Sequence, residues 1–362
     1  MDDEKDDLEY GDDSSHTETE DLLFRPATEA SRLSPVLKIA AAIVIGVVVF
    51  AVTLLSLDSQ LRKTIIPPPP PAKTCMLGRT NPTIRREWRT LNDTEKLDFV
   101  EAVQCLGRSP SKLGLRNSTR YEDFVWFHLQ AYKHSHRVAP SLPWHRYYIH
   151  IFEKALKEEC GLKGHLPYWD WALDAALPEE SPIWDNTLGL GGDGAGTYHC
   201  LQQGPFSFFQ PKYPFEHCLQ RHFYPEMHGI NYTVVKVDRI VNKAHSYDDF
   251  REWLEMGPHR MVHNGIGGEM PTDHSSNDPI FWVHHAQIDR LWWRWQMKEP
   301  VNRTTIAYEG PTTIDGNGWP SLEWNATLQD VFPMYRMADD VSVAELMNTE
   351  GEILCYRYPE YN

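Results

Sequence analysis

Basic residues are scarce in this 362-residue sequence, which has 35 Lys and Arg against 51 Asp and Glu and a formal net charge of −16. Such a chain lacks the excess of cationic side chains that neutralises nucleic-acid phosphates, so we expect no nucleic-acid partner. The charge is uneven, since the first 34 residues hold 12 acidic side chains and three basic ones. We expect residues 1–35 to form a disordered acidic tail, because highly charged segments of low hydrophobicity bury too little apolar surface to fold.

Charged residues are absent from 39–57, IAAAIVIGVVVFAVTLLSL. These 19 residues are about as long as a helix that crosses a bilayer. We expect a transmembrane helix over 36–57 rather than a cleaved signal peptide, because the run is long and no small-x-small cleavage site ends it. Residues 58–74 include five consecutive prolines and should form a stiff extended linker. The domain proper is then 75–362.

Cysteine and asparagine are both absent before the end of the apolar run, and the first cysteine is Cys75. An even number of cysteines favours disulfides in an oxidising compartment. The six are Cys75, Cys105, Cys160, Cys200, Cys218 and Cys355. Five glycosylation sequons agree with this, at Asn92, Asn117, Asn231, Asn302 and Asn325. We expect a type II membrane protein with a luminal or extracellular domain; a cytosolic domain with free thiols is the alternative, because basic residues flank the apolar run almost equally.

Internal repeats are also absent, so a solenoid or repeat array is not expected. Apolar spacing, cap residues and stop signals predict a mainly helical single domain. Residues 175–245 are rich in glycine, proline and aromatic residues without a sustained period, so we expect ordered loops there. The last 60 residues should hold short strands. The predicted helices cover 93–105, 120–132, 145–159, 246–263 and 279–297.

Two groups of histidines stand on the predicted helices. His259 and His263 are four residues apart in PHRMVHNGIGGEM, so both imidazoles would lie on one helix face, about 6 Å apart, and could chelate one metal ion. A third ligand would come from the adjacent pair His284 and His285, on the next predicted helix. Neighbouring residues are about 100° apart around a helix axis, so we expect only one of the pair to reach the metal.

The earlier group comprises His128, His134, His136 and His145. A lone histidine is more often a structural residue than a ligand, but two groups that each offer three imidazoles favour catalytic metal sites with an open position. Neither group has a carboxylate or a cysteine at ligand spacing, which argues against a carboxylate-bridged dinuclear hydrolase. Imidazole sets suit copper or zinc, and spacing alone does not choose between them.

Four motifs surround these histidines in order, PWHR at 143–146, PYWDW at 167–171, NDPIF at 277–281 and HHAQIDRLW at 284–292. Together they resemble the paired copper-binding motifs of tyrosinases, especially short fungal ones. The resemblance implies a mainly α fold in which a four-helix bundle with long irregular loops holds two copper ions. It also implies oxidation of phenols or ortho-diphenols to ortho-quinones with dioxygen as co-substrate, and in some members ortho-hydroxylation of monophenols. The implied substrate is a phenolic small molecule or a tyrosine-containing peptide, in pigment or secondary-metabolite biosynthesis.

The resemblance also implies a ligand set. It assigns the second histidine of the adjacent pair to copper, which leaves His284 behind the site. The implied ligands are His128, His136 and His145 for copper A, and His259, His263 and His285 for copper B.

The sequence departs from the family pattern at two places. Many fungal tyrosinases form a thioether from a cysteine where His134 stands here, so we expect no such crosslink. Arg260 replaces the asparagine that in several tyrosinases follows the first copper B ligand, and Asn264 follows the second ligand instead. We name Asn264 and Glu255 as candidate catalytic residues, with Glu252 as the alternative acid. The competing hypotheses are an ortho-diphenol or aminophenol oxidase that cannot hydroxylate, and an oxygen-binding or interaction protein without turnover.

Two further expectations concern the surroundings of the metal ions. Asp170 and Asp289 are candidates to orient ligand imidazoles through their second ring nitrogen. Tryptophans should line a dry cavity, although most of them are simply core residues. The candidates are Trp126, Trp144, Trp169, Trp171, Trp282, Trp292 and Trp295.

Overall fold

The computed structural model describes residues 82–315 and 325–359 together with 75, 320, 321 and 323, and five helical positions at 44, 46, 47, 49 and 50. The chain divides into two units, Met1–Pro67 and Pro68–Asn362. The predicted tail at 1–35 and linker at 58–74 lie outside the described residues, as does most of the predicted membrane segment. Within the part that is described, no helix has both the length and the apolar character needed to cross a bilayer.

Three of the predicted helices begin and end close to the expected positions: α2 (Asp93–Arg108), α3 (Arg120–Ser135) and α4 (Ser141–Cys160). The first two begin at capping boxes. The side chains of Asn92 and Thr119 each accept the main-chain N–H of the glutamate three residues later, and the side chain of that glutamate accepts the main-chain N–H of the cap residue. The third ends at Gly161, whose φ of 74° is the left-handed conformation that glycine adopts without strain. The mainly helical prediction for this region is confirmed.

The single helix expected at 246–263 is wrong in detail. The structure has α6 (Tyr247–Leu254), a π-helical turn over Glu255–His259, and α7 (Arg260–Ile266). Gly257 and Pro258 explain the interruption, because Pro258 has no N–H to donate and Gly257 takes a non-helical conformation, with φ −94° and ψ −112°. The turn places His259 at the start of α7.

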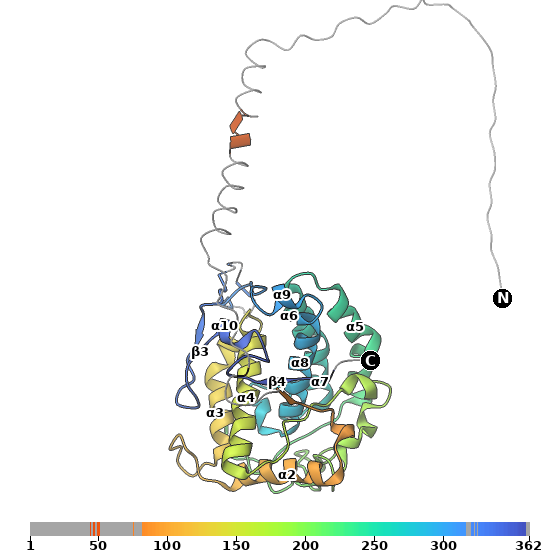
Figure 1. The fold of residues 1–362 in the computed structure, drawn as a ribbon. Helices are drawn as coiled ribbons and strands as arrows, with labels where there is room; N and C mark the ends of the chain where they lie inside the picture. Colours follow the sequence, from red (N-terminus) through yellow and green to blue (C-terminus); the bar gives the residue numbers. More distant parts are fainter. Residues whose placement is uncertain are drawn as a thin grey trace, which may run out of the picture. The chain divides into compact units, whose positions relative to one another are not determined.

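Helix α8 (Ile280–Gln296) is buried along almost its whole length. It packs against α4, which also packs against α2 and α3. Figure 1 shows α3, α4, α7 and α8 together within the domain. These four helices carry or border all the histidines of the two predicted groups.

The loop prediction for 175–245 missed one helix, α5 (Val234–Lys243), which packs against α8. Thr233 caps it, and Val237 and Val241 lie one turn apart on its buried face. Apart from short 3-10 turns, the rest of this region is irregular, as predicted.

The 3-10 turns described in the domain as a whole are Trp88–Thr90, Trp171–Asp174, Pro178–Glu180, Pro182–Trp184, Pro225–Asn231 and Ser275–Asn277.

One strand pair and one disulfide, β1 (Thr83–Ile84) with β4 (Tyr356–Arg357) and Cys75 with Cys355, join the two ends of the domain. β1 pairs in parallel with β4, and β2 (Val331–Phe332) pairs antiparallel with β3 (Val341–Ser342). Two short helices, α9 (Pro300–Arg303) and α10 (Val343–Leu346), complete the described elements. All six cysteines are paired, as the even count predicted: Cys75–Cys355, Cys105–Cys160 and Cys200–Cys218.

Candidate metal centre

The first histidine cluster is formed by α3, α4 and the residue that follows α3. His128 lies on α3, His136 caps its C-terminus, and His145 lies on α4. One ring nitrogen from each residue lies within 4.8 Å of the others. His128 and His145 are buried, with side chains 0% and 4% exposed. The structure therefore brings together the three residues predicted for copper A, while His134 is exposed on the same helix.

The second cluster contains four histidines rather than three. His259 and His263 contribute from the π-helical turn and α7, and both His284 and His285 contribute from α8, again within 4.8 Å of one another. The ring centroid of His284 lies 4.7 Å from that of His263, and the ring centroid of His285 lies 5.1 Å from that of His259. His284 therefore lies close to the His259–His263 pair as well, although a step of about 100° around the helix axis separates it from His285.

The two clusters are adjacent. The imidazole of His285 stacks on that of His145, with ring centroids 4.4 Å apart and planes at 12°. Phe281, one turn before His285, touches rings of both clusters, with centroids 4.1 Å from His285 and 5.2 Å from His128. The sequence reasoning missed Phe281, although its i, i+4 spacing to His285 was a usable signal.

Main-chain carbonyls orient five of the imidazoles through their Nδ1 atoms. His128 and His263 are held from the loop before α8, by the carbonyls of Asp273 and Met270 at 2.8 and 2.5 Å. Three others donate to the carbonyl four residues earlier: His136 to Tyr132, His145 to Ser141 and His259 to Glu255. With Nδ1 protonated and engaged, Nε2 keeps the lone pair that a metal requires.

Asp170 and Asp289 do not orient these imidazoles, so that prediction is wrong. The carboxylate of Asp170 accepts from Gln287 and Arg290 at 2.7 and 3.1 Å. The carboxylate of Asp289 accepts hydrogen bonds from Arg146, Tyr356 and Tyr358. Local carbonyls are within reach of the rings, whereas both carboxylates neutralise buried guanidinium groups.

Burial keeps the clustered histidines neutral. It lowers the pKa of His128 to about 4 and that of His259 to about 3, and neighbouring imidazoles act in the same direction. Desolvation also lowers the pKa of the remaining clustered histidines, His136, His145, His263, His284 and His285. Neutral imidazole is the metal-binding form, so the clusters are prepared to bind cations near pH 7.

The residues present fit a pair of metal ions. The buried Nε2 atoms of His128, His145 and His263 have no hydrogen-bond partner, which is costly for a polar atom unless a cation occupies the space between them. A donor set of imidazoles suits copper or zinc. Neither cluster includes a carboxylate among its grouped ligand atoms, in agreement with the sequence prediction.

A cavity of about 190 Å³ opens beside the clusters, lined by His136, His259 and His263. Glu255 is the one carboxylate among its lining residues, and Asn264 also lines it. Glu255 is buried and accepts the main-chain N–H of Arg137 at 2.6 Å and a guanidinium N–H of Arg251 at 2.9 Å. Burial raises the pKa of this carboxyl group against the effect of Arg251.

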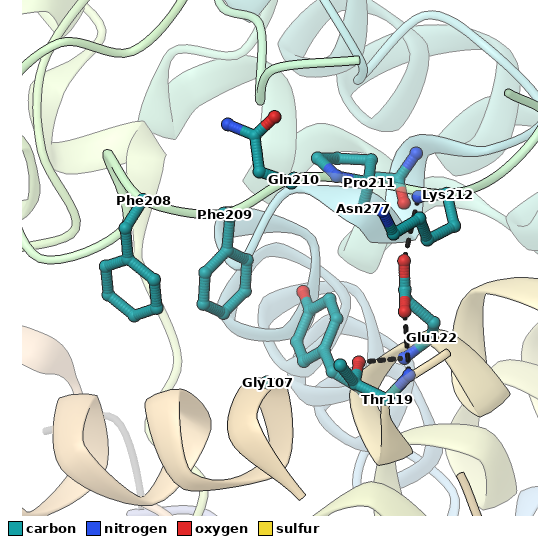
Figure 2. Close-up of a pocket in the computed structure, with 10 residues that line it drawn as sticks. Gly107, Thr119, Glu122, Phe208, Phe209, Gln210, Pro211, Lys212 and Asn277 are labelled. Atoms are coloured by element: carbon teal, nitrogen blue, oxygen red, sulfur yellow. Dashed lines mark hydrogen bonds between the residues drawn. The ribbon is translucent and has the colours of Figure 1, made fainter. Parts of the chain in front are cut away.

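A second cavity, of about 180 Å³, lies at the N-terminal end of α3 and contains no member of the two histidine clusters (Figure 2). The carboxylate of Glu122 accepts the main-chain N–H of Lys212 at 2.8 Å and that of Thr119 at 2.7 Å. This carboxylate therefore caps the helix and holds the loop at Lys212.

Two of the seven predicted tryptophans lie beside clustered histidines, and Trp282 is a core residue, as was expected for most of them. Trp144 packs on His145, with ring centroids 4.9 Å apart, and Trp171 lies 6.2 Å from His284. Trp282 instead stacks on Phe152 in the core. All six cysteines are in disulfides, which leaves no thiol for the thioether that many fungal tyrosinases form.

Comparisons with known proteins agree with this centre. Residues 118–298 match the model of the common central domain of tyrosinase. The chain is 39% identical over 294 residues to a tyrosinase of Aspergillus flavus, covering 77% of this chain and 80% of that protein. It is also 39% identical over 294 residues to a tyrosinase-like protein of Diaporthe leptostromiformis, covering 77% and 73%. A polyphenol oxidase variant from Thermothelomyces thermophila aligns with a TM-score of 0.69 at 27% identity, over 85% of this chain and 94% of that one.

The matched domain contains every histidine of both clusters. The chain belongs to the tyrosinase family, whose members are type 3 dicopper oxidoreductases that act on phenolic substrates.

Proposed function

We propose that this protein uses two copper ions and dioxygen to oxidise phenols or ortho-diphenols to ortho-quinones, with pigment or secondary-metabolite biosynthesis as its setting. The observation that carries the proposal is the pair of adjacent, buried, neutral imidazole clusters joined by the contact between His145 and His285. Bound copper would supply the redox chemistry that amino-acid side chains lack. The histidines would hold it, with His128, His136 and His145 at one site and His259, His263 and His285 at the other.

His285 rather than His284 is proposed as the third ligand of the second site because its ring reaches both clusters. Its ring stacks on His145 of the first cluster, whereas the ring of His284 lies near His263 and His259 and, on another side, near Trp171. We propose that His284 sits behind the site and limits how far the ligand rings can turn. Phe281 and Trp144 would exclude water from the reacting centre.

The cavity beside His259 is the proposed substrate site. Glu255 is positioned there to accept the phenol proton on a carboxylate oxygen, since its raised pKa makes it a stronger base than an exposed glutamate. Arg251 keeps the carboxylate in place. Asn264 offers an amide to orient the substrate hydroxyl or a water molecule.

Metal analysis and oxygen uptake test the proposal together. The purified full-length protein should bind two copper ions per chain and consume dioxygen with a catechol and, more slowly, with a monophenol. The absence of copper binding, or of turnover of either substrate by the copper-loaded protein, would refute the proposal. Copper binding without turnover would favour the oxygen-binding alternative, and absence of copper would favour an interaction protein.

An ortho-diphenol or aminophenol oxidase is the second candidate, and one observation favours it. Arg260 occupies the place where several tyrosinases have an asparagine, and it lines the cavity with Asn264. Turnover of a catechol without turnover of a monophenol would select this candidate.

Glu255→Gln separates the roles within the cavity. We expect this variant to lose monophenol oxidation about 10²-fold or more while it keeps both copper ions, because a positioned general base contributes on that scale. Glu252→Gln is the matched control, since Glu252 is exposed on α6, three residues before Glu255, and should leave the rate unchanged. Equal effects of the two substitutions would remove Glu255 from the mechanism.

We also propose that the domain lies in the lumen or outside the cell, anchored by residues 36–57. Three disulfides and the exposure of four of the five sequon asparagines, all but Asn231, support this placement. Protein made in its host should lose mass on treatment with an N-glycosidase and should pellet with membranes. A soluble, unglycosylated product would contradict the placement.

A further inference from the structure

A third group of potential metal ligands lies outside the two copper-type clusters. Nε2 of His217 lies 2.9 Å from Oε1 of Glu269, and Nε2 of His274 lies 3.5 Å from Oε2 of the same carboxylate. Glu269 is 1% exposed, and the side chains of His217 and His274 are 9% and 18% exposed. All three ligand atoms lie within 4.8 Å of one another. The group is therefore largely enclosed but remains in reach of a small ion.

Both imidazoles of this group are oriented from their far side. Nδ1 of His217 donates to the carbonyl of Phe215 at 2.6 Å, and Nδ1 of His274 donates to the carboxylate of Asp273 at 3.0 Å. Nε2 of a neutral ring then carries a lone pair that faces the carboxylate of Glu269. Two lone-pair donors around a buried anion require a cation between them, either a proton or a metal ion.

The distances suit a small tetrahedral ion. Bonds of 2.0–2.1 Å to nitrogen and oxygen place ligand atoms about 3.3 Å apart in a tetrahedron. The observed separations lie on either side of this value, at 2.9 Å from Nε2 of His217 to Oε1 of Glu269 and at 3.5 Å from Nε2 of His274 to the other oxygen, Oε2. Two histidines and one glutamate with one open position are a donor set that zinc uses.

We propose that His217, Glu269 and His274 bind one zinc ion, with a water molecule as the fourth ligand. The site would be separate from the two histidine clusters and would need no redox change of the metal. The other bonds of Glu269 fix its carboxylate for this role, because Oε1 accepts the main-chain N–H of Gln220 and Oε2 accepts the amide of Asn277.

The zinc ion would brace the loop that orients the copper-type ligands. Glu269 and His274 enclose the stretch whose carbonyls, from Met270 and Asp273, hold the imidazoles of His263 and His128. One ligand of each cluster thus depends on this loop. Fixing both ends of the loop to one ion would keep both imidazoles in their observed orientations.

Zinc counting on the copper-loaded, full-length protein tests the proposal. After incubation with zinc chloride and desalting, elemental analysis should find one more zinc ion per chain in the wild type than in His274→Ala. His217→Ala should show the same loss. His245→Ala is the matched control, because His245 is exposed and belongs to none of the clusters. The difference between wild type and variant is the measure, so the result does not depend on what fills the other two clusters.

Asp273→Asn provides a gentler variant that keeps all three ligands and the main-chain carbonyl. Loss of the carboxylate that orients His274 should weaken zinc binding about 10–100-fold, which is typical of such supporting residues. Circular dichroism would establish that each variant is folded. Equal zinc content in the wild type and in folded His274→Ala would overturn the proposal and leave an ion pair of protonated histidine and glutamate.

Discussion

Asp289 on α8 forms hydrogen bonds with residues of α4 and of the C-terminal segment that includes β4. Its replacement by asparagine tests how much these buried contacts contribute to stability. Its Oδ1 accepts Nε of Arg146 at 2.5 Å. Its Oδ2 accepts the hydroxyls of Tyr356 and Tyr358 at 2.5 and 2.6 Å, and Arg85 approaches at 3.4 Å. Arg146 and Arg85 are fully buried, and Asp289 is 3% exposed.

The expected loss follows from the two buried cations. Asp289→Asn keeps the shape of the side chain but leaves Arg146 with only neutral partners, the amide oxygen of Gln296 and two main-chain carbonyls. Arg85 still has Glu153. Removing one partner of a buried ion pair costs about 3–5 kcal/mol. At about 2–4 °C per kcal/mol for a domain of this size, the melting temperature should fall by about 10 °C.

Thermal denaturation with the disulfides intact is the assay, and the same helix provides a control. Asp238 pairs with Arg294 of α8 at 2.8 Å, but the Asp238 side chain is 39% exposed. Asp238→Asn should therefore cost less than about 1 kcal/mol. If Asp289→Asn lowered the melting temperature no more than Asp238→Asn, the argument that buried charge ties these elements together would fail.

Three further predictions concern the histidine clusters. His285→Ala should reduce bound copper from two ions to one per chain, whereas His284→Ala should keep two; the reverse pattern would exchange their roles. His284→Ala should instead lower the oxidation rate by loosening the ligand rings, and an unchanged rate would remove that supporting role. The metal-free protein should lose stability as the pH falls from about 6.5 towards 4, because the unfolded chain binds protons that buried His128 resists. The depressed pKa of His128 alone corresponds to about 3 kcal/mol over that interval. Denaturant unfolding at pH 7 and pH 5 measures this, and a pH-independent midpoint would contradict it.

Local patterns in the sequence were enough to predict most of the helices and to indicate histidine as the metal ligand. The Asn92 and Thr119 caps, the stop at Gly161 and the i, i+4 pair at His259 and His263 all act within a few residues of chain. Interactions between residues so close in the sequence can be predicted without knowledge of the tertiary structure. The interruption at Gly257 and Pro258 is equally local, since both residues disfavour a continuous helix.

Contacts between distant segments were beyond the same reasoning. The carbonyl that holds His128 comes from Asp273, 145 residues further along the chain. The rings of His284 and His285 both lie near His263, which is on α7. The pattern of residues around α8 alone does not show where His263 lies. Asp289 was assigned to the imidazoles because nothing in the sequence showed that Arg146 and Arg85 would be buried beside it.

The sequence by itself determined the chemistry available to this protein: imidazoles in two groups, no carboxylate at ligand spacing, and paired cysteines. Only the tertiary structure decided how that chemistry is presented. It placed His145 against His285, buried the rings so that they remain neutral, and set a carboxylate in the adjoining cavity. The physical reason is that donor identity belongs to each residue, whereas desolvation, ring orientation and the distance between clusters arise only when helices far apart in the chain are packed together.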